Sequence, residues 1–235
     1  MAFNTSVFKT RALTALVFVG VMSAGLFTNG YAFIALFTIV MFGCIYELYK
    51  LIIKIEKISD RTFLPLSVLY IIFPVFLLID LGLNGNVYIH KGADHFSPAD
   101  YSPLFPCAII FSIWINDTMA YIVGSLIGKT PLSSVSPKKT WEGTIGGVLL
   151  SVVVIGLAGR YLPIAQALSS IHWFAIAAIA AVFGTLGDLF ESKLKRLADV
   201  KDSGSFMPGH GGFLDRFDSL LIAVPFVWMY IQLIC

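Results

Sequence analysis

The segment GDLFESKLKRLADVKDSGSFMPGHGGFLDRFDS, residues 187–219, carries acidic and basic side chains between two apolar runs, one starting at Ile171 and the other ending at Cys235. A glycine-rich turn, residues 208–212, interrupts this segment. Carboxylates suit divalent metal ions, lysine and arginine suit phosphate, and glycine lets the backbone approach a ligand closely. Because all three kinds of residue lie together at the ends of apolar runs, the segment predicts a metal-dependent phosphate site at the surface of a lipid bilayer.

The composition is that of a membrane protein. Of the 235 residues, 57% are hydrophobic and 13% are charged, whereas soluble domains carry about 25% charged residues. The mean hydropathy is +0.85, and several apolar runs approach the ~20 residues that span a bilayer. We therefore expect an all-α, polytopic helical membrane protein. About seven transmembrane helices are predicted, at residues 12–28, 31–53, 63–81, 104–127, 143–159, 172–190 and 217–235.

These spans suggest both a division of the chain and an orientation. Residues 1–103 hold the N-terminal transmembrane helices and an outer loop, and residues 104–235 form a transmembrane catalytic region, within one integral membrane domain. All 16 Lys and Arg residues except Lys91 and Arg160 fall on the same side of the predicted bilayer. The positive-inside rule places that side in the cytoplasm. The expectation is a multi-pass protein of the cell inner (plasma) membrane, with a cytoplasmic N-terminus and a site that faces the cytoplasm.

Two carboxylates lie within predicted spans. Asp117 follows Asn116 deep in the fourth span, where a charged side chain costs at least ~2.5 kcal/mol on insertion scales and should face protein or water. Asp117 is either a functional group or a buried polar packing residue. Glu47 lies near the cytoplasmic end of the second span, where it would reach the interface or pair with a neighbour.

A second basic segment, SPKKTWEGTIGG at residues 136–147, follows the fourth span. Lys138 and Lys139 offer charge for phosphate, or they anchor a helix end. Thr140 is placed to cap the next helix, with Glu142 in its first turn, where negative charge suits the helix dipole. The glycines of the GxxxG pattern at 143–147 predict close helix packing.

The acidic residues of the opening segment should converge. Asp188, Glu191 and Lys195 share one face of the sixth helix, and Asp215 and Asp218 are three residues apart at the start of the last. The two helix ends would thus bring three carboxylates, Asp188, Asp215 and Asp218, towards one point, and Asp117 would be a fourth if it faces the same cavity, where a cation would offset their repulsion. The alternative is a set of solvated acids paired with the nearby basic residues.

The order of these motifs resembles a known signature. The matching segments are SKLKR at 192–196, KDSG at 201–204, PGHGG at 208–212 and DRFD at 215–218, supported by NDT at 116–118, SPKKT at 136–140, YEL at 46–48 and KTR at 9–11. Together they resemble the phosphatidate cytidylyltransferase family, also called CDP-diglyceride synthases. The resemblance covers most of the chain from Trp114 onward. Met207 stands where the family usually has Leu, Ile or Phe, and the N-terminal half is shorter than in many members.

The resemblance implies a nucleotidyltransferase of phospholipid biosynthesis. CTP and phosphatidic acid would give CDP-diacylglycerol and pyrophosphate, with Mg²⁺ and room for a second cation. A phosphate monoester is already an anion near neutral pH, because its second pKa is near ~6, so a strong general base is not required. The partners implied are CTP, phosphatidic acid and the bilayer, without nucleic acid, and the family admits a homodimer.

Under this hypothesis each candidate residue has a role. Asp188 and Asp215 bind Mg²⁺, with Asp117 or Asp218 in support. The catalytic residues are Asp188, Asp215, Asp218, Lys201 and Lys139. The substrate-binding residues are Ser136, Lys138, Lys139, Thr140, Lys195, Arg196, Lys201, Gly209, His210, Gly211, Gly212 and Arg216.

Other activities fit parts of the pattern. A CTP-dependent enzyme could act on an isoprenoid lipid phosphate or a polyprenol with the same motifs. An ion or proton transporter would use Asp117 and Asp188 along its path, and internal repeats would favour it, but the sequence shows no convincing repeat. Flux across proteoliposomes without CTP would distinguish the transporter from the enzymes.

Overall fold

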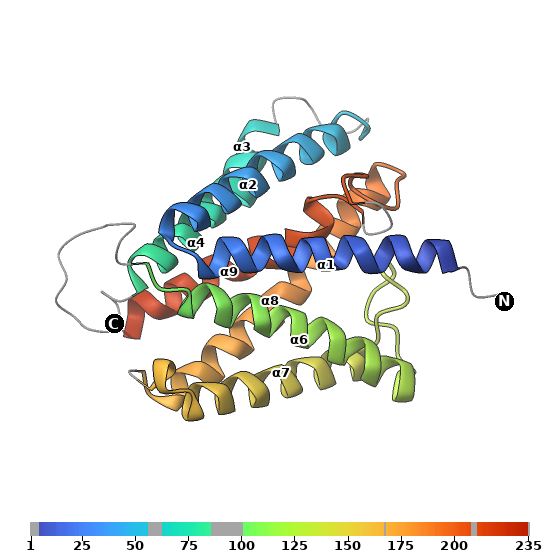
Figure 1. The fold of residues 1–235 in the computed structure, drawn as a ribbon. Helices are drawn as coiled ribbons and strands as arrows, with labels where there is room; N and C mark the ends of the chain where they lie inside the picture. The colour runs from blue at the N-terminus through green and yellow to red at the C-terminus, as the bar shows by residue number, and fades with distance from the viewer. Residues whose placement is uncertain (1–4, 56–62, 86–100, 167, 208–210, 235) are drawn as a thin grey trace.

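A computed structural model describes residues 5–55, 63–85, 101–166, 168–207 and 211–234, with only the backbone for residues 5–11. The chain is built from helices (Figure 1): α1 (Thr5–Phe27), α2 (Gly30–Ile52), α3 (Phe63–Ser67), a π-helical turn (Val68–Ile72), α4 (Phe73–Leu83), α6 (Leu104–Ile127), α7 (Trp141–Tyr161), a 3₁₀ turn (Pro163–Ala165), α8 (Ser170–Leu197) and α9 (Leu214–Ile234). Within the described residues, β-pairing is limited to isolated bridges, Pro131 with Thr140 and Met207 with Gly211. The predicted all-α class is confirmed.

Six helices in the described part of the chain are long and apolar enough to cross a membrane: Gly30–Ile52, Phe63–Leu83, Leu104–Ile127, Trp141–Tyr161, Ser170–Leu197 and Leu214–Ile234. The first predicted span coincides with a shorter apolar stretch of α1, Ala12–Phe27. The protein is therefore a multi-pass helical membrane protein. Helix α8 is longer than the predicted span 172–190, because it begins at Ser170 and continues to Leu197. Glu191 and Lys195 lie on this helix, as their predicted place on one face with Asp188 requires.

Local sequence signals set the helix ends. The side chain of Asn29 caps α2 by accepting a hydrogen bond from Ala32 N at 2.9 Å. Thr140 caps α7 as predicted, accepting from Gly143 N at 3.2 Å, and Glu142 lies in the first turn. Glu142 also accepts a hydrogen bond from Thr130 Oγ1 at 2.8 Å, which fastens the α6–α7 connection to the start of α7.

Glycines allow the helices around the charged residues to pack closely. A Cβ atom on Gly143 would lie 2.6 Å from Ala120 O of α6, and one on Gly147 would lie 2.6 Å from Asn116 O. The packing role predicted for the GxxxG pattern is thus confirmed. A Cβ atom on Gly187 of α8 would lie 2.5 Å from Asp218 O of α9. A larger residue at any of these positions would push two helices apart.

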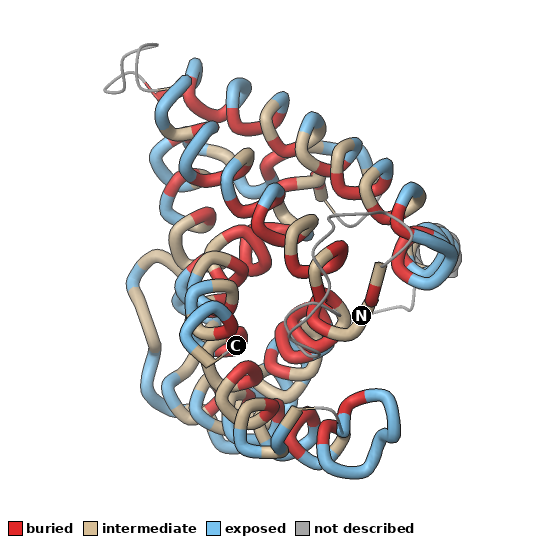
Figure 2. Tube along the Cα trace, turned by 90° about the vertical axis from the view of Figure 1, so that its left-hand side faces the viewer, coloured by how far each residue is buried: buried red, intermediate tan, exposed pale blue. Residues whose placement is uncertain are grey.

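Buried apolar side chains form one core cluster that reaches from Met22 to Ile231 and includes Phe33, Phe105 and Trp173. Exposed apolar side chains cover the outside of the helices, for example Leu16 at 70% exposure and Leu126 at 76%. Figure 2 shows this arrangement, with buried segments facing inward and exposed ones facing outward. Such a surface suits lipid. The α6–α7 and α8–α9 connections and the start of α1 lie at one end of the bundle, whereas α9 ends at the other (Figure 1).

Candidate active site

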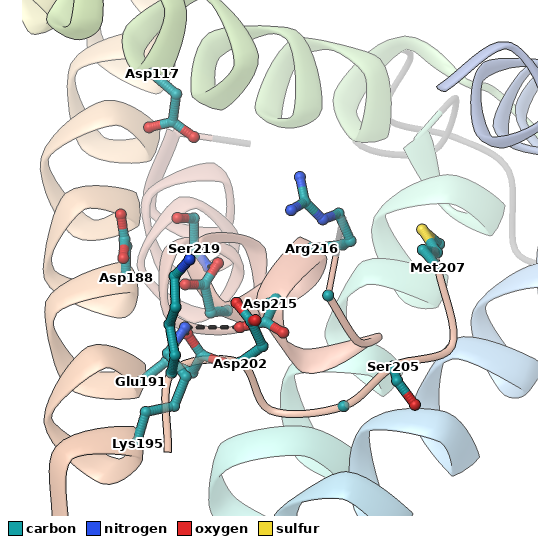
Figure 3. Close-up of a pocket in the computed structure, with 14 residues that line it drawn as sticks. Asp117, Asp188, Glu191, Lys195, Asp202, Ser205, Met207, Asp215, Arg216 and Ser219 are labelled. Carbon is teal, nitrogen blue, oxygen red and sulfur yellow. Dashed lines mark hydrogen bonds and ion pairs between the residues drawn. The ribbon is translucent and has the colours of Figure 1, made fainter. Parts of the chain in front are cut away.

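A cluster of carboxylates lies between α8 and α9. Asp188, Glu191 and Asp218 can each offer an oxygen so that all three oxygens lie within 4.8 Å of one another. Asp188 and Glu191 are one helical turn apart on α8, and the contact at Gly187 brings α9 and Asp218 alongside. These side chains line a cavity of about 450 Å³, shown in Figure 3, together with Asp117 of α6. The predicted convergence of carboxylates from separate helices is thus observed, with Glu191 as an additional member.

Glu191 is the most enclosed member of the cluster. It is 0% exposed, and its Oε2 lies 2.5 Å from the ammonium of Lys195. Apart from that ion pair, neither carboxylate oxygen of Glu191 has a hydrogen-bond donor among the described residues. Buried carboxylates beside one another repel unless a cation or a proton offsets their charge. The oxygen donor set, in which Oε1 of Glu191 has no partner among the described residues, therefore fits a hard divalent cation.

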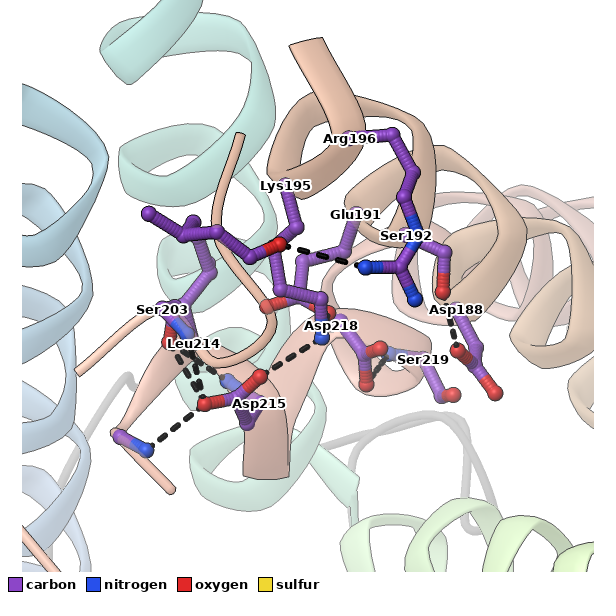
Figure 4. A network of polar contacts seen from close by, with 12 residues as sticks. Asp188, Glu191, Ser192, Lys195, Arg196, Ser203, Leu214, Asp215, Asp218 and Ser219 are labelled. Carbon is purple, nitrogen blue, oxygen red and sulfur yellow. Dashed lines mark hydrogen bonds and ion pairs between the residues drawn. The ribbon is translucent and has the colours of Figure 1, made fainter. Parts of the chain in front are cut away.

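Lys195 joins this cluster to Asp215 at the start of α9. Its ammonium lies 2.6 Å from Asp215 Oδ1. The other oxygen, Oδ2, accepts hydrogen bonds from Ser203 N at 2.9 Å and from Gly212 N at 2.7 Å. Figure 4 shows this network. Asp215 thus holds the α8–α9 connection against α9. Among the described residues, Lys195 is the one hydrogen-bond donor to Oδ1, so this oxygen retains a lone pair for a further ligand.

Glu47 of α2 anchors the same connection from the other side. It is 4% exposed, and its Oε2 accepts from Ser203 Oγ at 2.8 Å and from Leu214 N at 2.9 Å. Ser203 Oγ also lies 2.9 Å from Asp215 Oδ2, so one hydroxyl proton is shared between two carboxylates. The expected pairing of Glu47 with a neighbour is confirmed, and the partners belong to the segment that carries the site.

A second cavity, of about 510 Å³, lies between α6, α7 and α8. The α6–α7 connection lines it with Lys138 and Lys139, and the Lys139 ammonium forms an ion pair with Asp188. Asp117 and Asp188 line both cavities. The two spaces therefore meet at a wall of carboxylates, with basic side chains on each side.

Most of the predicted site residues are brought together. The first cavity is lined by Asp117, Asp188, Lys195, Lys201, Gly211, Asp215, Arg216 and Asp218. The second is lined by Ser136, Lys138, Lys139 and Thr140, together with Asp117 and Asp188.

Other candidates lie elsewhere. Arg196 is exposed, lines neither cavity, and donates a hydrogen bond to Val200 O at 3.3 Å. Gly212 is buried behind the first cavity, where its N–H donates to Asp215. Gly209 and His210 lie outside the described residues. The glycine-rich turn has left-handed backbone at Gly211, with a φ of 83°, a conformation that favours glycine.

The sequence prediction omitted three residues of this region from its site. Glu191 shares the helical face of Asp188, which was a usable signal. Ser203 enters the sequence prediction only within the KDSG motif at 201–204. Asp202, which lines the first cavity, carried no periodic signal because it lies in the α8–α9 connection.

Comparisons with known proteins agree with this arrangement. The family model described as "Cytidylyltransferase family" matches residues 62–234. A phosphatidate cytidylyltransferase of Bacillus subtilis is 45% identical over 131 residues, which are 55% of this chain and 46% of that protein. One from Synechocystis is 43% identical over 122 residues, 52% of this chain and 41% of the relative. The chain thus spans less than half the length of these two relatives.

A third relative is similar along its whole length. The phosphatidate cytidylyltransferase of Thermotoga maritima is 31% identical in an alignment that covers 96% of this chain and 97% of that protein. The resemblance drawn from the motifs is therefore confirmed. With a family match from residue 62 to residue 234 and a relative matched nearly end to end, this chain belongs to the cytidylyltransferase family.

Proposed function

We propose that the protein is a phosphatidate cytidylyltransferase, which converts CTP and phosphatidic acid into CDP-diacylglycerol and pyrophosphate. The observation that carries this proposal is the pair of cavities that meet at Asp117 and Asp188, with basic residues on both sides. Such an arrangement suits two polyanionic substrates that must come together at one point. The family and the names of the relatives support the same reaction.

In this reaction the main role of the protein is to hold the two substrates together and to offset the negative charge of their phosphates. An oxygen of the lipid phosphate forms a new bond to the α-phosphorus of CTP, and the bond from that phosphorus to the β-phosphate oxygen breaks, so that pyrophosphate leaves with the electron pair. Lys201 and Arg216 in one cavity and Lys138 in the other offset the negative charge of the phosphates. Since the attacking phosphate is already ionised near neutral pH, no residue has to remove its proton.

The site is proposed to bind Mg²⁺. Asp188, Glu191 and Asp218 would hold the ion, and Asp215 and Asp117 add further carboxylates to the same cavity. When bound, a divalent cation offsets the charge that develops on the leaving phosphates. Lys195, held between Glu191 and Asp215, keeps the two carboxylates in place.

The orientation is part of the proposal. Lys50, Lys54, Lys138, Lys139 and Lys201 lie in or beside the segments at the end of the bundle that carries the site, while Arg160 lies in the last turn of α7 at the opposite end. By the positive-inside rule the site faces the cytoplasm. We propose the cell inner (plasma) membrane as its location, where phosphatidic acid would reach the site from the adjacent leaflet.

Pyrophosphate release by the detergent-purified protein tests this function. CTP and phosphatidic acid are supplied together and separately, with and without Mg²⁺, and release is expected only with both substrates and the metal. Lys201→Ala should raise the KM for a phosphate substrate on the order of tenfold, as expected for a lost charge-assisted contact. Lys193→Ala is the matched control, because Lys193 is exposed on α8 and lines neither cavity. A folded protein that releases no pyrophosphate, or that transports ions without CTP, would overturn the proposal.

A further inference from the structure

An apolar groove of about 470 Å³ runs between α1, α2 and the start of α9. Val17 and Val21 line it from α1, Ile39 from α2, and Phe213 and Phe217 from the other side. Thr14 is the one polar residue among the described side chains that line it. Val17, Val21 and Ile39 are 58%, 53% and 63% exposed, so the groove opens sideways to the surroundings of the helices.

The groove begins where the charged cavity ends. Met207 lines both spaces. Arg216 lines the charged cavity and also a small pocket that it shares with Met22 and Phe217, both of which line the groove. A molecule with an anionic head beside Arg216 and an apolar tail would therefore meet continuous, chemically matched walls.

The second cavity offers a different lining. Ser136, Lys138, Lys139 and Thr140 of the α6–α7 connection contribute polar and basic groups to it, alongside Ala120, Tyr121 and Gly124 of α6. These groups suit the phosphates and hydroxyls of a nucleotide. An acyl chain there would lie against the ammonium groups of Lys138 and Lys139 and the carboxylate of Asp188, whereas Thr14 is the one polar residue among the described side chains that line the groove.

We infer that the groove between α1 and α2 holds an acyl chain of the phosphatidic acid substrate, with the phosphate at Arg216 and the nucleotide on the α6–α7 side. This inference rests on the proposed function. Lipid tails in a bilayer are already in an apolar medium, so the groove contributes little binding energy by removing the chain from water. Its effect is to orient the lipid, so that the attacking phosphate is held at the carboxylate wall.

A groove-filling substitution tests the inference. Val21→Trp projects an indole into the groove, and Val19→Trp is the matched control, because Val19 is 49% exposed on α1 and does not line the groove. Both variants are compared with wild type on dioleoyl and dihexanoyl phosphatidic acid. Val21→Trp should lower kcat/KM for the dioleoyl lipid on the order of tenfold through misplacement of the phosphate, with a smaller effect on the dihexanoyl lipid and an unchanged KM for CTP. Val19→Trp should resemble wild type with both lipids.

Crosslinking gives a readout that does not depend on turnover. A phosphatidic acid probe with a diazirine in one acyl chain should label the peptides that contain Val17, Val21 and Ile39, and excess phosphatidic acid should abolish this labelling. A phosphatidylcholine probe with the same chain controls for bulk lipid.

Three outcomes are distinguishable. Equal labelling by both probes, or equal effects of Val21→Trp and Val19→Trp on an active protein, would overturn the groove assignment and leave the proposed function intact. Absence of pyrophosphate release by wild type with both lipids would overturn the proposed function itself. Labelling confined to α6 and α7 would place the chain in the second cavity instead.

Discussion

Replacement of Glu47 by alanine should loosen the connection between α8 and α9. Glu47 Oε2 accepts hydrogen bonds from Ser203 Oγ at 2.8 Å and from Leu214 N at 2.9 Å, in a site where Glu47 is 4% exposed. A hydrogen bond to a charged group contributes about 1.5–3 kcal/mol, and an unsatisfied buried N–H costs about 1–3 kcal/mol.

The two losses do not simply add. Ser203 Oγ lies 2.9 Å from Asp215 Oδ2 and can donate its hydrogen bond to that oxygen instead. The free-energy cost of burying the Ser203 hydroxyl is therefore largely offset in the variant. Leu214 N has no such alternative carboxylate in the contacts of the described residues. We therefore expect Glu47→Ala to lower the free energy of unfolding by about 3 kcal/mol, and Glu47→Gln, which retains an acceptor without the charge, by about 1 kcal/mol.

Unfolding with increasing SDS from mild detergent micelles measures the global effect. Amide hydrogen exchange of the peptide that contains Leu214 measures the local one, and exchange there should accelerate on the order of a hundredfold in Glu47→Ala. Phe42→Ala is the matched control on the same helix. Because Phe42 is 63% exposed, its replacement should change the free energy of unfolding little. If the free energy of unfolding of Glu47→Ala lies within about 0.5 kcal/mol of the wild-type value, which is the range of a neutral surface substitution, this account of the buried carboxylate is refuted.

Three other predictions concern the carboxylate cluster and its supports. Mg²⁺ at a hundredfold excess over its Kd should stabilise the wild-type protein by up to about 2.7 kcal/mol, which is measured as a rise in the thermal midpoint. Asp218→Asn should abolish most of this rise. An unchanged rise in the variant would remove Asp218 from the metal site. Asp188→Asn should lower kcat on the order of a hundredfold or more, as loss of an electrostatic group at the reacting atoms does, and wild-type kcat in this variant would exclude Asp188 from catalysis. Gly187→Ala should cost about 1–3 kcal/mol through overpacking, since its Cβ would lie 2.5 Å from Asp218 O. Gly20→Ala, with no atom within 4 Å of its new Cβ, should be neutral or stabilising by up to about 1 kcal/mol. Equal midpoints for the two alanine variants would contradict the packing argument.

Local periodicity predicted the part of the site that depends on single helices. Asp188 and Glu191 share a face because residues three apart are neighbours on a helix, and apolar length alone located α6 and α9 to within a few residues. The sequence prediction assigns Arg196 to a substrate phosphate, as one of the basic residues of the site motifs. On a continuous helix the next residue is rotated by about 100°, so the extension of α8 to Leu197 turns Arg196 away from the cavity.

Contacts between distant segments could not be obtained in this way. The ion pair of Lys139 with Asp188 joins residues 49 apart, and the hydrogen bond of Ser203 to Glu47 joins residues 156 apart. Both depend on how connections fold back over helix ends, which no local pattern specifies. The predicted boundary between residues 103 and 104 stays a prediction, and so does a homodimer.

The wall formed by Asp117 and Asp188 has a kinetic consequence. Among the described residues the two cavities share only these carboxylates and otherwise have separate linings, so we expect both proposed substrates to be bound at the same time. Initial velocities measured against both substrates should then give intersecting double-reciprocal lines, the pattern of a ternary complex. A covalent cytidylyl-protein would instead produce parallel lines and exchange of label between CTP and pyrophosphate without lipid, and either result would contradict this expectation.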